Sequence, residues 1–153
     1  MAEVRRASTA DVPTLVDLMG EFYAEAGFPL DRGWAAAAFT TLLDDESRGA
    51  VWVVDCDGEA AGHAVLSVRF AMEFGGLAGY IDDLFVRPPF RRRGAARAAV
   101  DALVAECRRR GCHALHVEVD PANEPAVRLY QAYGLAPPAD GRQEFRGLLT
   151  PGG

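Results

Sequence analysis

Hydrophobic positions early in the chain recur with the helical period of about 3.6 residues. This spacing predicts one helix over residues 12–26 and a second over residues 31–46. Ser8 and Asp11 resemble a capping box at the start of the first helix, with the aspartate in the role usually taken by Glu. Gly27 permits a left-handed cap, and the proline two residues later prevents the helix from continuing.

The pattern then changes to the short β-rich runs that are typical of a sheet. We expect strands over residues 3–6, 50–54, 61–70, 80–86, 113–119 and 141–149. Asp57-Gly58 predicts a hairpin, and glycines at 75, 76 and 79 break the chain before the fourth strand, so the first strands should form an antiparallel meander. A helical pattern over residues 96–111 joins the fourth strand to the fifth, which should therefore run parallel to each other.

The turn after residue 86 has the features of an anion site. Pro88 and Pro89 stop the strand because neither can donate a ladder hydrogen bond. The next helix opens with Gly94, Ala95 and Ala96, surrounded by Arg91, Arg92, Arg93 and Arg97. Free N–H groups at a helix start, together with the macrodipole, attract anions. We therefore expect a phosphate-bearing ligand here, although neither the Gly-Lys-Ser/Thr of a P-loop nor the Gly-x-Gly-x-x-Gly of a dinucleotide fold is present.

Composition is that of a soluble globular protein, with 50% hydrophobic and 25% charged residues, and we expect one domain over residues 1–153. No apolar run approaches membrane-spanning length, and the N-terminus lacks a signal peptide's hydrophobic region. These features predict a cytoplasmic location without a membrane partner. Cys56, Cys107 and Cys112 lack metal-ligand spacing, and we interpret them as reduced structural thiols.

Charge is distributed unevenly along the chain. The net charge is −6, yet residues 87–97 contain five arginines and no acid, so the rest of the chain carries −11. Nucleic-acid binding usually requires a broad basic face, and we therefore expect no nucleic-acid partner. A small positive patch on an acidic body suits an anionic cofactor beside a cationic substrate.

Two motifs resemble signatures of one family. Arg91-x-x-Gly94-x-Ala96, preceded by Val86-x-Pro88, resembles the acetyl-CoA pyrophosphate loop of the GNAT superfamily of N-acetyltransferases, with Ala96 where Gly is more frequent. Residues 123–134 read Asn-x-x-Ala-x-x-x-Tyr-x-x-x-Gly, which is similar to the second GNAT signature; the next residue is Leu where the family usually has Phe. The resemblance covers about Val4 to Leu149. It implies a mixed α/β (α+β) fold with a mostly antiparallel sheet of six to seven strands, one parallel splayed pair and about four helices.

The resemblance also implies roles for particular residues. The residues expected to bind acetyl-CoA are Leu84, Phe85, Val86, Arg91, Arg92, Arg93, Gly94, Ala95, Ala96, Arg97, Asn123 and Tyr130. The Tyr130 hydroxyl matches the general acid that protonates the departing thiolate. The backbone N–H of Leu84 matches the donor to the oxyanion. On helical spacing alone, however, Tyr130 fits a core position better than a catalytic one.

Acetyl transfer to an amine needs a proton acceptor, because an alkyl amine with a pKa of about 10 is protonated at neutral pH. Asp82 and Asp83 are the candidates on the central strand, and we expect them to point to opposite faces because side chains alternate. Residues 81–86 resemble those of diamine N-acetyltransferases, which implies that Asp82 takes the proton through water and that Asp83 helps hold the acceptor. Glu118 is the reserve base. The histidines show no metal pattern, and we expect no metal.

The sequence therefore predicts an acetyl-CoA-dependent N-acetyltransferase that acts on the primary amine of a small, cationic molecule by direct attack in a ternary complex. An amino acid, an aminoglycoside or a peptide N-terminus is the alternative acceptor. A non-catalytic CoA-binding module is the alternative from another class. Both a monomer and a homodimer stay open.

Overall fold

The computed structural model describes residues 1–149; the last four residues of the expected 1–153 domain lie outside the described part. In chain order the elements are β1 (Ala2–Arg6), α1 (Val12–Glu25), α2 (Arg32–Asp44), β2 (Gly49–Cys56), β3 (Glu59–Ala71), β4 (Gly76–Val86), α3 (Ala95–Arg109), β5 (Ala114–Val117) and α4 (Glu124–Ala132). Short 3₁₀ turns span Thr9–Asp11, Glu46–Arg48 and Pro88–Phe90. The expected number of about four helices is confirmed.

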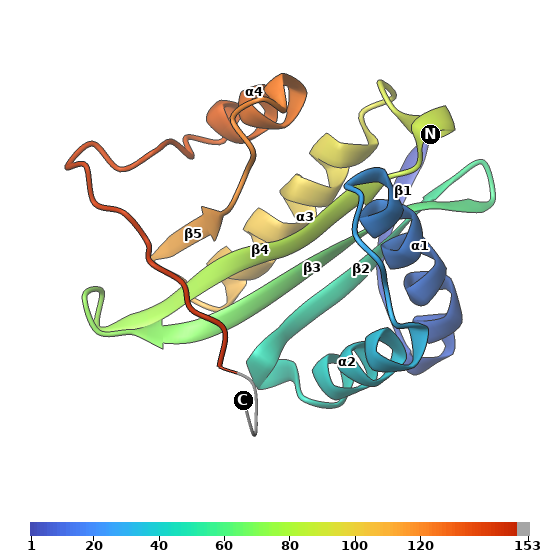
Figure 1. Cartoon of the computed structure of the whole chain (residues 1–153), viewed down its shortest axis with the longest axis horizontal. Helices are drawn as coiled ribbons and strands as arrows, with labels where there is room; N and C mark the ends of the chain where they lie inside the picture. The colour runs from blue at the N-terminus through green and yellow to red at the C-terminus, as the bar shows by residue number, and fades with distance from the viewer. Residues whose placement is uncertain (150–153) are drawn as a thin grey trace.

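The strands form one five-stranded sheet in the order β1-β2-β3-β4-β5 (Figure 1). The first four pair antiparallel with their sequence neighbours, and β5 lies parallel to β4 after the crossover through α3. The meander and the parallel pair predicted from sequence are both confirmed.

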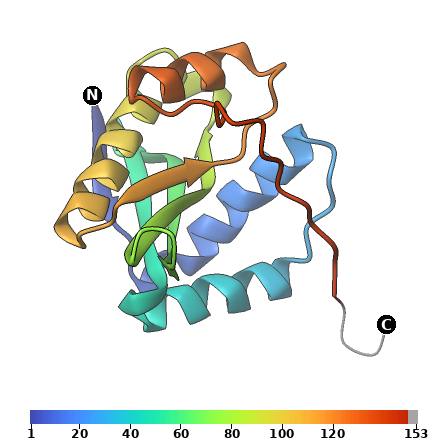
Figure 2. The same ribbon diagram turned by 90° about the vertical axis from the view of Figure 1, so that its left-hand side faces the viewer.

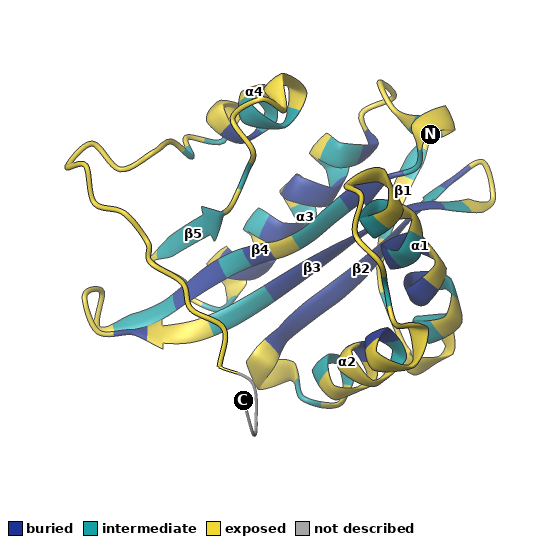
Figure 3. Cartoon of the chain, in the orientation of Figure 1, coloured by how far each residue is buried: buried dark blue, intermediate teal, exposed yellow. Residues whose placement is uncertain are grey.

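Helices cover both faces of the sheet. Figure 2 shows α3 on one side of the strands and α1 with α2 on the other. One apolar cluster packs α3 residues such as Leu103 against Leu66, and the other packs Leu15 and Phe39 against Val51. The central strands are therefore buried from both sides along most of their length (Figure 3). Such burial makes the sheet a rigid platform for groups at its edges.

Local chemistry explains several boundaries. Asp57 and Gly58 have φ values of 53° and 81°, which is the two-residue turn favoured in hairpins and confirms the predicted one. The Asp31 carboxylate accepts the Trp34 N–H at 2.9 Å and caps α2. Gly79 lies inside β4 and does not end it. A Cβ at this position would come within 2.8 Å of Cys107 Sγ, so only glycine fits here. This glycine is needed for close packing of α3 on the sheet.

The expectation of six to seven strands is wrong, because the sheet among residues 1–149 has five. Residues 141–149 form no strand, and β5 is shorter than the predicted 113–119. Two prolines and a glycine precede this tail, and its large apolar side chains remain exposed: Phe145 at 89%, Leu148 at 80% and Leu149 at 97% (Figure 3). A single segment that buries so little apolar surface gains too little free energy to pair with the four-residue edge strand β5.

Candidate active site

The segment from Arg87 to Arg97, which we call the cofactor loop, leads into the start of α3, where the first backbone N–H groups of the helix have no helical partner. Gly94 adopts φ 81°, and the first helical hydrogen bond runs from the Ala98 N–H to the Gly94 carbonyl at 2.9 Å. The preceding N–H groups of the first turn therefore have no partner within the helix. A Cβ on Gly94 would meet no atom within 4 Å, so the space beside this glycine is open. This cradle fits a phosphate group.

The edge of β4 next to the cofactor loop is also open. Parallel pairing with β5 stops at Ile81. The Arg87 N–H donates to the Ala61 carbonyl at 2.7 Å, and bonded pairs alternate with non-bonded pairs in an antiparallel ladder. By this alternation, Leu84 and Val86 direct their backbone N–H and C=O groups away from β3. They face the edge of β4 that β5 no longer pairs with beyond Ile81. An extended ligand could pair with these groups as an added strand does.

Two of the loop arginines are bound to α1. Arg91 Nε donates to the Val86 carbonyl at 2.8 Å, and its Nη2 contacts both Glu25 carboxylate oxygens at 2.8 and 2.7 Å. Arg87 Nε donates to Glu21 at 2.9 Å. These guanidinium groups hold the cofactor loop to α1, so their charge is already partly neutralised.

The remaining loop arginines differ in their partners. Arg93 lies 3.2 Å from Asp57. Arg97 stacks over the Tyr133 ring at 5.8 Å, and Arg92 has φ 63°, an unusual value for a residue with a side chain. Within residues 1–149, neither Arg92 nor Arg97 forms an ion pair with an acid. These two arginines therefore offer the charge that is free for an anionic ligand.

β4 contains a β-bulge at Asp82. Val65 of β3 pairs with Asp83 and Leu66 pairs with Ile81, which leaves Asp82 as the extra residue. Asp82 and Asp83 consequently border the same pocket of about 320 Å³, between β4 and the helices α1 and α2. The expectation that they point to opposite faces is wrong, because it assumed an unbroken alternation that a bulge interrupts.

The smaller pocket has a negative electrostatic character. Restricted hydration in the pocket and the charge of Asp83 raise the pKa of Asp82, against a hydrogen bond from Ser67 that lowers it. Burial, followed by the charges of Asp83 and Asp82, raises the pKa of Tyr23, which lines the same pocket. Both shifts mean that adding further negative charge here is unfavourable, and that a cation is favoured.

His63 contacts Asp83 from inside the core. Its ring is fully buried, its Nε2 lies 3.3 Å from Asp83 Oδ2, and its Nδ1 has no partner among the described residues. Phe22, Phe39 and Phe85 surround the ring with centroids between 6.1 and 6.3 Å away. Because only Nε2 has a partner, the tautomer with its proton on Nε2 gives the satisfied hydrogen bond, donated to Asp83.

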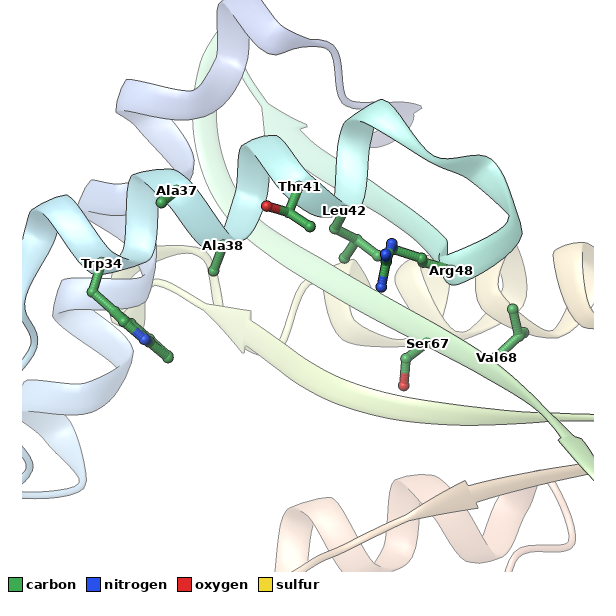
Figure 4. A pocket seen from close by; sticks show the side chains of 8 residues that line it. All are labelled: Trp34, Ala37, Ala38, Thr41, Leu42, Arg48, Ser67 and Val68. Carbon is green, nitrogen blue, oxygen red and sulfur yellow. The ribbon is translucent and has the colours of Figure 1, made fainter. Parts of the chain in front are cut away.

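A larger pocket of about 530 Å³ adjoins the smaller one, since Ala38 and Leu42 line both. It lies between α2 and β3 (Figure 4), lined by Trp34, Ala37, Ala38, Thr41, Leu42, Arg48, Ser67 and Val68. In Figure 4 the Trp34 and Ser67 side chains project into the open space beneath α2, and Arg48 extends toward Leu42. The two pockets therefore lie next to each other along α2.

Tyr130 and Asn123 lie on α4, across the sheet from these pockets. Tyr130 is 7% exposed and packs in the same cluster as Val86, with Leu84 at the edge of that cluster. Burial raises its pKa to about 12, so the hydroxyl keeps its proton, and it makes no hydrogen bond to the described residues. The Asn123 side chain caps α4 by accepting the Ala126 N–H at 3.3 Å.

Comparison with known proteins identifies the family. The sequence model described as the acetyltransferase (GNAT) family matches residues 14–135. This chain belongs to the GNAT family. It is therefore an N-acetyltransferase, and GNAT acetyltransferases use acetyl-CoA. The matched range contains both motifs that resembled GNAT signatures, and the resemblance to the GNAT superfamily is confirmed.

Solved structures similar to this GNAT chain extend over nearly its whole length. An integron cassette protein, HFX_CASS3, from the mobile metagenome of Cole Harbour Salt Marsh is 39% identical, with a TM-score of 0.87 over 97% of this chain and 91% of that chain. A putative acetyltransferase from Arthrobacter sp. FB24 is 29% identical, with a TM-score of 0.81 over 95% and 96%. AAC(6')-Iy, in complex with a CoA-S-monomethyl-acetylneamine bisubstrate analogue, is 20% identical, with a TM-score of 0.81 over 98% and 99%, and shares the fold. Among proteins with curated descriptions, none matches the chain.

Other candidate residues of this GNAT enzyme lie apart from the pockets. Glu118 is exposed immediately after the end of β5. Cys56 and Cys107 are buried, and burial raises the pKa of the Cys107 thiol to about 12, so it is not a ready nucleophile. Within residues 1–149, no group of three or more His, Cys, Asp or Glu side chains could hold a metal ion, and every helix is too short or too polar to cross a bilayer.

Sequence reasoning missed three residues of this GNAT enzyme: Tyr23 and Arg48, which line the two pockets, and His63, which contacts Asp83 from the core. His63 is a polar residue inside the apolar run 61–66, and a buried polar side chain of that kind usually has a specific partner. Tyr23 and Arg48 gave no local signal, because each reaches its pocket only after α1 and α2 pack on the sheet.

Proposed function

We propose that this enzyme transfers the acetyl group of acetyl-CoA to the primary amine of a small molecule, by direct attack in a ternary complex. The amine would arrive as an ammonium, and would therefore be cationic at its reacting end. The bulge at Asp82 carries this proposal, because it brings two carboxylates into one pocket beside the open edge of β4. We call these two neighbouring pockets together the acceptor groove.

The cofactor loop would hold the pyrophosphate of acetyl-CoA. The open cradle at Gly94 and the unpaired charges of Arg92 and Arg97 support this assignment. Arg91 and Arg93 would act mainly by shaping the loop, because Glu25 and Asp57 already engage them. When bound, acetyl-CoA supplies an activated thioester whose carbonyl carbon is open to attack by a neutral amine.

Asp82 is the proposed proton acceptor, through water because its side chain is short. Burial raises the pKa of Asp82, which makes its carboxylate a stronger base than that of an ordinary aspartate. Asp83 would balance the ammonium charge, and the hydrogen bond from His63 would hold its carboxylate in place. Glu118 is less suited, because it lies exposed beyond the groove.

Leu84 and Tyr130 would act on the thioester from the other side. The Leu84 N–H, directed to the open edge, would donate to the acetyl oxygen as negative charge develops there. The Tyr130 hydroxyl, which keeps its proton and lacks a protein partner, would donate to the departing sulfur. An acceptor that binds on the α2 side would then meet the thioester at the edge of β4. The two aspartates would lie on one side of the reacting atoms, and Leu84 with Tyr130 on the other.

The test is a panel of amines assayed for CoA release with acetyl-CoA. It should hold diamines, amino alcohols, amino acids and an aminoglycoside, because the similar structure AAC(6')-Iy is described with an aminoglycoside-derived analogue. We expect turnover of small primary amines, and a fall of about 10²-fold in kcat for Tyr130→Phe. Tight acetyl-CoA binding without acetylation of any amine would favour a non-catalytic CoA-binding module instead.

A further inference from the structure

Arg48 presents a free guanidinium edge to the acceptor groove. It follows α2 in the turn Glu46–Arg48 and lines the larger pocket. Its Nε lies 3.3 Å from Asp45 Oδ2, and within residues 1–149 neither of its Nη atoms forms a hydrogen bond. A guanidinium held through Nε keeps its two terminal N–H groups available side by side, which is the geometry that binds a carboxylate in bidentate fashion.

Asp45 is fixed in place, so the position of Arg48 is also restrained. The other oxygen of Asp45, Oδ1, accepts the Ser47 N–H at 3.0 Å and the Ser47 hydroxyl at 2.6 Å. These donors hold the pKa of Asp45 below its ordinary value, so the carboxylate stays ionised and keeps its contact to Arg48. The short turn therefore restrains the position of the Arg48 guanidinium.

Ser67 connects the two ends of the groove. It lines the pocket that contains Arg48, and it lies near enough to Asp82 to lower the pKa of that carboxyl, against the larger effect of burial. The wall between the two ends is apolar and comes from α2, with Trp34, Ala38 and Leu42. The acceptor groove thus has two carboxylates at one end, one arginine at the other and an apolar surface between them.

From this arrangement, and resting on the proposed function, we infer that the acceptor carries a carboxylate at the end remote from its amine, and that Arg48 binds it. Arg48 is thereby a specificity-determining residue. A second ammonium at the same end would meet the positive guanidinium, so a diamine is disfavoured. This narrows the cationic amine expected from sequence to a molecule that is cationic at its reacting end and anionic at the other.

The experiment uses matched linear amines of the form H₂N–(CH₂)ₙ–X, where X is an ammonium, a hydroxyl or a carboxylate and n runs over several lengths. CoA release gives kcat/KM for each compound. For wild type at the best chain length, we expect kcat/KM for the carboxylate to exceed that for the alcohol by about tenfold, and that for the diamine by more. A charge-assisted bidentate contact accounts for a difference of that size.

Three variants identify the residue responsible. Arg48→Gln should lower kcat/KM for the carboxylate to about that for the alcohol. Arg48→Lys should keep only part of the preference for the carboxylate, because an ammonium cannot form the bidentate contact of a guanidinium. Arg108→Gln is the control, since Arg108 is exposed on α3 at the other face of the sheet. Arg48 is 60% exposed, so its loss should leave thermal unfolding unchanged and the kinetic comparison intact.

The outcomes separate the two proposals. A wild-type enzyme that prefers the diamine or the alcohol, or an Arg48→Gln variant that keeps the carboxylate preference, overturns the role of Arg48 while amine acetylation stands. If acetyl-CoA binds and none of the amines reacts, both proposals fail together.

Discussion

The cofactor loop and the acceptor groove are built in different ways. The loop is continuous in sequence, and the groups proposed to bind phosphate are mainly the backbone N–H groups that follow one glycine. The groove gathers single side chains from α1, α2, β3 and β4. Backbone recognition can therefore be encoded within a few residues, whereas a side-chain pocket exists only after packing. Changes in the loop should affect the cofactor alone, and changes in the groove the acceptor alone.

The strongest test of the loop is Gly94→Glu. A carboxylate at the open helix start would repel a pyrophosphate, and φ 81° adds strain, so we expect acetyl-CoA affinity to fall by about 10²-fold or more. Gly111→Glu is a matched control: Gly111 has φ 74°, also meets no atom within 4 Å, and follows the other end of α3. Titration calorimetry measures both, and equal affinities would refute the loop as the phosphate site.

Tyr130→Phe tests where the two regions meet. Loss of the hydroxyl should lower kcat by about 10²-fold while acetyl-CoA affinity is kept. The control is Tyr133→Phe, which loses hydrogen bonds to Asp101 at 2.5 Å and to the Arg97 carbonyl at 3.1 Å, and should cost about 1 kcal/mol of stability with little change in kcat. Full turnover by the Tyr130 variant, with chemistry rate-limiting, would leave this residue a packing role only.

Asp82→Asn tests the groove through pH. The wild-type rate should rise as Asp82 loses its proton, at a pH above that of an ordinary aspartate because its pKa is raised. The variant should lose about tenfold or more near neutral pH and recover toward the amine's own pKa of about 10, where solvent supplies neutral substrate. Pre-steady-state acetylation rates across pH measure this, with acetyl-CoA affinity as the control. A pH profile identical to wild type would exclude Asp82 as the base.

The arginines of the loop give a smaller, graded effect. Arg92→Gln should weaken acetyl-CoA binding about threefold, and more at low salt, because it removes a charge without a protein partner. Arg93→Gln should change affinity less, since Asp57 already pairs with that guanidinium at 3.2 Å. Binding isotherms at two salt concentrations compare them, and the reverse order would show that the Asp57 pair opens on binding.

The same Asp82 substitution has a small effect on stability with a defined sign. A carboxyl whose pKa is raised by folding contributes stability below pH 3.8, and this contribution is lost as pH rises through the raised pKa. Asp82→Asn should therefore be more stable than wild type at pH 7 and equal to it at low pH.

Glu106 is the opposite case, because Arg109 and Arg110 lower its pKa to about 2. Glu106→Gln should be less stable at pH 7, a difference that fades as pH falls toward 2, in thermal unfolding.

The sequence predicted the loop side of the molecule well. The helix start at Gly94 and the hairpin at Asp57-Gly58 both depend on the backbone preferences of adjacent residues. Whether Asn123 contacts the cofactor stays a prediction, because its role as the cap of α4 already accounts for an asparagine there. The same ambiguity applies to Tyr130, which packs in the core as its spacing indicates.

The groove side was predicted less well, for physical reasons. A bulge results from how β4 pairs with β3, so the shared orientation of Asp82 and Asp83 leaves no mark in the local pattern. Gly79 looked like a strand breaker, but the approach of Cys107 from a distant helix explains it. Residues 141–149 have a strand-like composition, yet no partner strand for them forms within the described chain.

The one inserted residue of β4 makes neighbouring side chains of this strand face both sides of the sheet. Asp82 and Asp83 face one layer of the protein, and Leu84 immediately after them faces the opposite layer and the free edge. Deleting one codon between Ile81 and Leu84 should give a more regular ladder while leaving only one acid on the proposed acceptor side. The shortened protein should still fold, and by the proposed mechanism it should no longer acetylate an amine.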